Sequence, residues 1–274
     1  MNILLPLISS LLVAISSFPL KKIMKTGEGF SVALIAEVFT LVFLLPLTNF
    51  SGFVFSFSWN LLIAVILWII FSVTLMFSYN KVDASSRLIF FGIQPVLAVL
   101  FSALIVGEVI SFNVIISMLF GAVACFFLFK GSDSGMFTKI GFILSLITSV
   151  VFALAGSFDK ILSNQFGVFN YLAILSVCMI PILFVLAIAL KKPVIKNLKK
   201  NFWRIIVYAL LGVSVSSLNF NSYLINGVGI TNLVLLSAIP IGIIIGYFVG
   251  EKDHMKEKII ASVLVILSVI ILSV

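Results

Sequence analysis

Among the long apolar runs of this sequence, the one that contains residues 214–223 is the most polar. Within it, Ser216, Asn219 and Tyr223 recur at the i, i+3 and i+7 spacing that places side chains on one face of a helix. Such a face favours a cavity over lipid, where its hydroxyl and amide groups could hydrogen-bond a small solute. The alternative is that these side chains join neighbouring helices, as Ser and Asn commonly do in helical membrane proteins.

A second face of similar geometry mixes aromatic and polar side chains. It carries Trp68, Ser72 and Tyr79, and Gln94 adds an amide on the next apolar run. Small-molecule sites usually have apolar walls with a few directional polar groups. We therefore predict that these residues bind substrate together with the face at 214–223.

Glu37 is the one ionisable residue that the sequence places deep inside an apolar run, 31–48. A carboxylate in mid-membrane is costly and is a functional candidate by default. Glu37 could bind a coupling proton or a cationic substrate. Alternatively, it faces a water-filled vestibule or makes an architectural pair with Lys21, Lys22 or Lys160.

Four further residues are candidates for gating or structural roles. Pro95 and Pro240 lie inside two apolar runs, where proline allows a helix to bend. Glu108 and Glu251 close the same two runs, although the helix dipole disfavours a carboxylate at a helix C-terminus. Each glutamate is therefore expected to have a local partner, such as Lys252 for Glu251.

The composition indicates that transmembrane helices position these side chains. Of the 274 residues, 62% are hydrophobic and 9% are charged, whereas soluble domains are about half apolar and about a quarter charged. The net charge of +8 lies in clusters between apolar runs, so we expect no nucleic-acid partner. Cys125, Cys178 and His254 lack ligand spacing, which argues against a metal site, a disulfide framework and a histidine-based enzyme.

Polar or charged breaks divide the chain into apolar runs of about the 20 residues that cross a bilayer. We predict an all-α membrane protein whose short loops leave no room for a soluble domain. Its ten predicted spans are 3–20, 31–48, 59–79, 87–106, 112–129, 139–158, 169–190, 202–226, 230–249 and 258–274.

Positive charge is distributed unequally between the two sides of these spans. Of the 17 Lys and Arg residues, all but Lys160 lie in or beside the loops that follow odd-numbered spans. The positive-inside rule then places these loops in the cytoplasm and both termini outside.

The two halves of the chain carry matching residues in the same order. The matched pairs are Lys22 with Lys160, Gly29 with Gly167, Tyr79 with Tyr223, Pro95 with Pro240, and Gly107-Glu108 with Gly250-Glu251. Each half has five spans, an odd number, so the second half must cross the membrane in the opposite sense. The sequence thus predicts an inverted repeat, with halves at 1–130 and 131–274.

This pattern resembles the EamA-like branch of the drug/metabolite transporter superfamily. The resemblance rests on ten short helices in two halves, each with a proline in its fourth helix and Gly-Glu closing that helix. It implies a central cavity lined mostly by helices 1, 3, 4, 6, 8 and 9, with helices 5 and 10 peripheral. The chain departs from this type at Glu37, where a basic residue is common, and in termini predicted outside rather than in the cytoplasm.

The resemblance implies a secondary transporter or exporter of a small organic metabolite, such as an amino acid or amine. We expect alternating access in the cell membrane, with protons as a candidate coupling ion, contact with lipid, and a monomer or homodimer. We expect no enzymatic activity, no cofactor and no ATP site, since a glycine-rich phosphate loop is absent. One alternative is a carrier of nucleotide-linked or lipid-linked sugars, which would favour basic residues in the cavity. Another is a structural or sensory subunit that transports nothing.

Overall fold

The computed structural model describes residues 2–25, 27–49, 58–81, 93–130, 139–249 and 255–273, and over these residues it contains helices and no strands. Helices are expected in lipid because each backbone N–H and C=O group must be hydrogen-bonded within its own segment. The elements are α1 (Leu4–Met24), α2 (Gly29–Leu44), the 3-10 turn η1 (Leu45–Leu47), α3 (Trp59–Lys81), α5 (Ile93–Ile105), α6 (Phe112–Lys130), α7 (Lys139–Phe166), α8 (Val168–Ala189), α9 (Val194–Asn226), α10 (Val228–Leu235), α11 (Ala238–Val249) and α12 (Met255–Ser273).

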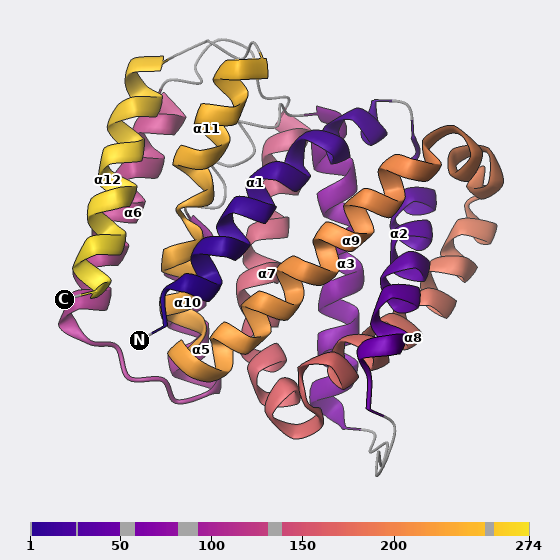
Figure 1. Ribbon diagram of the computed structural model, residues 1–274, viewed down its shortest axis with the longest axis horizontal. Coiled ribbons are helices and arrows are strands. Elements are labelled where there is room, and N and C mark those ends of the chain that lie inside the picture. Colours follow the sequence, from indigo (N-terminus) through magenta and orange to yellow (C-terminus); the bar gives the residue numbers. More distant parts are fainter. Residues whose placement is uncertain are drawn as a thin grey trace.

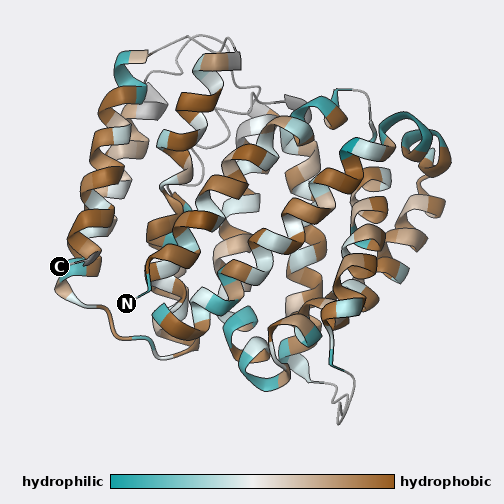
Figure 2. Ribbon diagram, viewed as in Figure 1, coloured by the Kyte–Doolittle hydropathy of each residue, from teal (hydrophilic) through white to brown (hydrophobic). Residues whose placement is uncertain are grey.

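Each predicted span coincides with one helix or, for the ninth span, with the pair α10 and α11, so the all-α membrane fold is confirmed. Among the described residues, seven segments are long and apolar enough to cross a membrane, and α5 and α6 are shorter apolar helices. Hydrophobic residues run along the helices while hydrophilic ones gather near their ends (Figure 2). The chain is a multi-pass membrane protein.

The helices pack as a bundle with two distinguishable ends (Figure 1). The chain begins and finishes at one of them, here called the terminal end. The opposite end, where α1 finishes and α9 begins, is called the lysine-rich end because it carries Lys21, Lys22 and the lysines at 191–200. α3 packs against α7, and α1 packs against α9. The pair α6 and α12 lies at one edge.

Two connections at the terminal end consist of a single glycine. Gly167 joins α7 to α8 with φ +78°, and Gly227 joins α9 to α10 with φ +90°. Glycine adopts this left-handed backbone without the steric cost that a Cβ atom brings. These glycines therefore hold consecutive helices directly end to end.

The ninth span is broken near its middle. Pro240 has no N–H, and its ring clashes with the carbonyl four residues earlier, which belongs to Leu236. Accordingly, α10 ends at Leu235 and α11 begins at Ala238. Pro95 lies in the first turn of the described part of α5 and is buried. Residues 82–92, just before it, lie outside the described part of the chain.

Candidate functional site

A cavity of about 170 Å³ lies between the helices in the larger of two hydrophobic cores. Its walls come from α1, α2, α3, α7, α8 and α9, with Leu235 at the end of α10. The lining residues of α1 and α3 run from the middle of each helix toward the lysine-rich end. The cavity therefore extends from the middle of the bundle toward that end.

Five of the predicted binding residues lie together in the cavity wall. They are Trp68, Ser72 and Tyr79 of α3, and Ser216 and Asn219 of α9. The spacing in the sequence predicted them because it indicates which side chains share one face of a helix. In the folded bundle, these faces of α3 and α9 both line the cavity.

Gln94 and Tyr223 do not belong to the described lining of this cavity. Gln94 donates a hydrogen bond from Nε2 to Oδ1 of Asn232 at 2.7 Å and so joins α5 to α10. Tyr223 is fully buried and stacks on Phe220, with ring centroids 5.8 Å apart. The expectation that the fourth helix lines the cavity is likewise wrong for the described part of α5, and α2 and α8 line it instead.

Glu37 lies in the cavity wall on α2. The hydroxyl of Ser176, on α8, donates a hydrogen bond to its Oε2 atom at 3.1 Å. Within the described ranges, no lysine or arginine lies within ion-pair distance of Glu37. The architectural pairs considered for it with Lys21, Lys22 or Lys160 are therefore not observed.

Asp159 is a second buried carboxylate, which the sequence analysis missed. The sixth span was predicted to finish at residue 158, just before two charged residues, but α7 continues to Phe166. Asp159 is 1% exposed, so the expectation that Glu37 alone is ionisable within a span is wrong. The Trp68 indole donates to its Oδ1 atom at 2.9 Å, and the Tyr171 hydroxyl donates to the same oxygen at 2.6 Å. These hydrogen bonds give the buried carboxyl group polar partners inside the bundle.

Stacked aromatic rings lie on the side of the cavity toward the terminal end. Tyr171 stacks on Phe220 with centroids 5.6 Å apart, and Phe220 stacks in turn on Tyr223. All three side chains are at most 1% exposed. We call these three stacked rings, of which Phe220 lines the cavity, the floor of the cavity.

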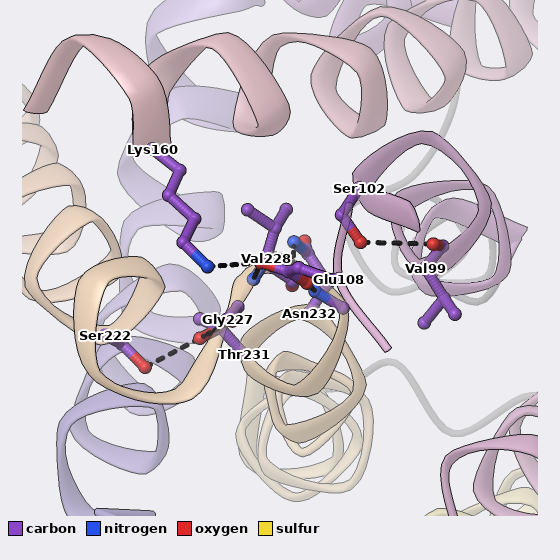
Figure 3. Close-up of polar contacts among 10 residues, drawn as sticks. Val99, Ser102, Glu108, Lys160, Ser222, Gly227, Val228, Thr231 and Asn232 are labelled. Carbon is purple, nitrogen blue, oxygen red and sulfur yellow. Dashed lines mark hydrogen bonds and ion pairs between the residues drawn. The ribbon is translucent and has the colours of Figure 1, made fainter. Parts of the chain in front are cut away.

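Below this floor, Glu108 joins three parts of the chain (Figure 3). Its Oε1 atom accepts from Lys160 Nζ at 2.7 Å and from the Val228 backbone N–H at 2.8 Å. Its Oε2 atom accepts from the Gly229 N–H at 3.2 Å, so the carboxylate also caps the N-terminus of α10. We call Glu108, Lys160 and the α9–α10 turn the clasp. It borders a second cavity of about 280 Å³ at the terminal end.

The charge state of Glu108 follows from its partners. Burial by itself raises the pKa of its carboxyl group. The hydrogen bonds from Lys160, Val228 and Gly229, together with the charge of Lys160, outweigh this effect and hold the pKa below its usual value. Glu108 is therefore ionised at neutral pH. Glu251, its predicted counterpart, lies outside the described residues.

Comparison with protein families finds a match for the first half of the chain. Residues 1–130 match the model of the EamA-like transporter family. Residues 1–130 are an EamA-like transporter domain. This confirms the resemblance to the drug/metabolite transporter superfamily.

Known proteins outside the family model add information on the fold alone. A crystal structure superposes with a TM-score of 0.77, covering 99% of this chain and 96% of the other, at 13% sequence identity. No curated protein matches the sequence. The whole chain thus adopts a fold that a solved structure already shows.

The EamA-like domain contributes half of the site. It supplies α1, α2 and α3 to the cavity wall, and the second half of the chain supplies α7, α8, α9 and α10. The clasp has the same division, because Glu108 belongs to the EamA-like domain and Lys160 with Gly227 to the second half. Both the cavity and the clasp therefore lie where the two halves meet.

Proposed function

We propose that the chain is a secondary transporter that moves a small organic cation by alternating access. The observation that carries this proposal is the chemistry of the cavity wall. Glu37 supplies a carboxylate, and Trp68, Phe71, Phe152 and Phe220 supply aromatic surface. A carboxylate beside aromatic rings favours an ammonium group through charge and cation–π attraction.

The wall also argues against the carrier of nucleotide-linked or lipid-linked sugars. Diphosphate groups are usually bound by Arg or Lys. The described lining of the cavity includes neither residue type. Amines, including amino acids that carry a second amine, fit this lining better.

Ligand-induced thermal stabilisation of the purified protein tests the proposal. Choline, a primary amine, a zwitterionic amino acid, a neutral sugar and a sugar nucleotide would be compared in detergent at equal concentrations. We expect the cations to raise Tm and the sugar compounds to leave it unchanged, because binding to the folded state alone stabilises it. Stabilisation by the sugar nucleotide and by none of the cations would replace this proposal with the sugar-carrier function.

Accessibility of single cysteines provides a prediction about the cavity face of α9. In a background with Cys125 and Cys178 replaced by Ala, Ser216→Cys should react with a membrane-impermeant thiol reagent, and choline should slow the reaction. Leu210→Cys is the matched control, because Leu210 is on the same helix, is exposed and lines neither cavity. Reaction at Leu210→Cys with none at Ser216→Cys would place the water-filled face elsewhere.

The proposal includes the orientation predicted from the charges. Both termini lie at one end of the bundle, and Lys21, Lys22 and the lysines at 191–200 lie at the other (Figure 1). This distribution supports termini that face outside. A fluorescent protein that matures only in the cytoplasm should stay dark when fused after Val274, while a reporter active outside should work. Bright fluorescence of the fusion would reverse the orientation.

A further inference from the structure

Asp159 has no role in the transport function proposed above. It lies directly behind the cavity wall, because Trp68, which donates to it, is itself a lining residue. Its second donor, Tyr171, comes from α8. The Asp159 carboxyl group thus joins α3, α7 and α8 at a single oxygen atom.

The groups that face Asp159 are mostly neutral. Trp68 and Tyr171 donate hydrogen bonds, and Tyr223 of α9 lies within electrostatic reach of both Asp159 and Glu108. The described parts of α5 and α10 carry no ionisable side chain. Lys160, the next residue along α7, is held by Glu108 at 2.7 Å.

A buried carboxylate in these surroundings has two ways to avoid a lone charge. It can bind a proton, or a cation can move close to it. In the part of the chain that the structure describes, no cationic side chain is within 4 Å of Asp159. A cationic substrate in the cavity would lie beside Trp68, whose indole donates to Asp159, and its charge would favour the ionised form.

A change in the protonation of Asp159 can also affect the terminal end. Asp159 and Lys160 are consecutive on α7; Asp159 contacts Trp68 in the cavity wall, and Lys160 belongs to the clasp, where it contacts Glu108. Hydrogen bonds to an ionised acceptor are roughly twice as strong as those between neutral groups. Protonation therefore loosens the Trp68 and Tyr171 contacts and frees this part of α7 to shift, with Lys160 attached to it.

We propose that Asp159 is the proton-binding residue of the transport cycle, and that it exchanges its proton for the cationic substrate bound beside Glu37. The proton comes from water on one side of the membrane and is released on the other, and no other bond is made or broken. This inference rests on the proposed function. It assigns substrate recognition to Glu37 and coupling to Asp159.

Asp159→Asn in proteoliposomes tests the inference with radiolabelled choline, a permanent cation that cannot cross lipid as a neutral base. Asparagine is similar in size and its Oδ1 atom can still accept both hydrogen bonds, so charge is the main change. We expect choline-for-choline exchange to persist while accumulation driven by an imposed pH gradient is lost. Proton release on adding choline to the detergent-solubilised protein should occur in the parent and be absent in the variant.

The outcomes separate this inference from the proposed function. If the parent neither exchanges choline nor releases protons on binding it, the cation transporter itself is wrong. If the parent exchanges choline and Asp159→Asn accumulates it equally well, only the role of Asp159 is overturned.

Tyr171→Phe provides a second measurement that does not depend on the folding of Asp159→Asn. It removes one donor to the carboxylate and leaves the carboxylate in place. Because that donor stabilises the ionised form, the pH midpoint of choline-induced proton release should move upward. An unchanged midpoint would overturn the inference.

Discussion

Replacing Glu37 with glutamine is expected to remove recognition of cations almost completely. The substitution keeps the size and hydrogen-bonding capacity of the side chain but leaves no negative charge in the described lining of the cavity. Losing one partner of a buried charge pair costs roughly 2 kcal/mol or more, which corresponds to about a 30-fold or larger loss of affinity. Choline binding, followed by thermal stabilisation and by radioligand titration, measures the effect.

Ser176→Ala is the matched control for Glu37→Gln. It removes the hydroxyl that donates to Oε2 and keeps the carboxylate. The carboxylate that attracts the cation remains, so we expect a smaller loss of choline affinity than in Glu37→Gln. Equal choline affinity in Glu37→Gln and the parent would show that Glu37 is architectural.

Replacing Glu108 with alanine is expected to cause the largest loss of stability. The side chains of Glu108 and Lys160 are 17% and 23% exposed, and the substitution leaves the Lys160 charge and two N–H groups of α10 without their acceptor. Loss of an ion pair and a helix cap of this kind costs roughly 2–4 kcal/mol. The fall in Tm in detergent measures it. Lys192→Gln breaks the more exposed Lys192–Glu28 pair and should change Tm much less.

Exchanging the two charges should not restore the clasp. In a Glu108→Lys, Lys160→Glu double variant the ion pair can reform, but a cation then lies at the N-terminus of α10, where the dipole favours an anion. We expect the double variant to remain close to the alanine variant in Tm. Recovery to the parent value would mean that the ion pair alone matters.

Acid should weaken the clasp in the parent protein. Since the pKa of Glu108 is lower in the folded protein than its ordinary value of 4.5, its stabilisation is present above pH 4.5. The contribution is lost as the pH falls through the lowered pKa. Glu108→Ala should therefore show a smaller fall in Tm than the parent on acidification below pH 4.5.

Helices and helix faces were predictable from the sequence because both depend on neighbours within the same segment. Apolar runs located the spans, and spacing placed Ser216 with Asn219 and Trp68 with Tyr79. The contacts of Asp159 were not predictable, because they join residues on three helices. One local signal was available: residues 159–166 contain no Gly or Pro, and Gly167, a natural helix stop, follows.

The partner of Glu108 shows the same limit. The unfavourable position of a carboxylate after α5 correctly indicated that it needs a partner. Lys160 lies 52 residues away, and the α10 N-terminus exists only because the chain turns at Gly227. A charged side chain with no oppositely charged neighbour in the sequence therefore predicts that it has a partner in the fold. It does not predict which residue that partner is.

The inverted repeat stays a prediction that the helix contacts support. The first and eighth spans, α1 and α9, pack together, as do the third and sixth, α3 and α7. These are the pairs that an exchange of the two halves would interchange. The hydrogen bond between Gln94 and Asn232 joins the fourth and ninth spans, which the repeat matches with each other. Contacts between matching spans are expected near a twofold axis.

The break before Pro240 makes α10 a short separate helix with a different contact at each end. Its eight residues form a rod about 12 Å long. At its N-terminal end the Val228 N–H donates a hydrogen bond to Glu108, and at its C-terminal end Leu235 lines the cavity. Next to Leu235, the Val234 carbonyl accepts a 3.3 Å hydrogen bond from Ser10 of α1, whose hydroxyl also donates to the Pro6 carbonyl at 2.7 Å. α10 therefore connects the clasp at the terminal end to the cavity wall as one rigid segment, so a displacement of the clasp would be transmitted to Leu235.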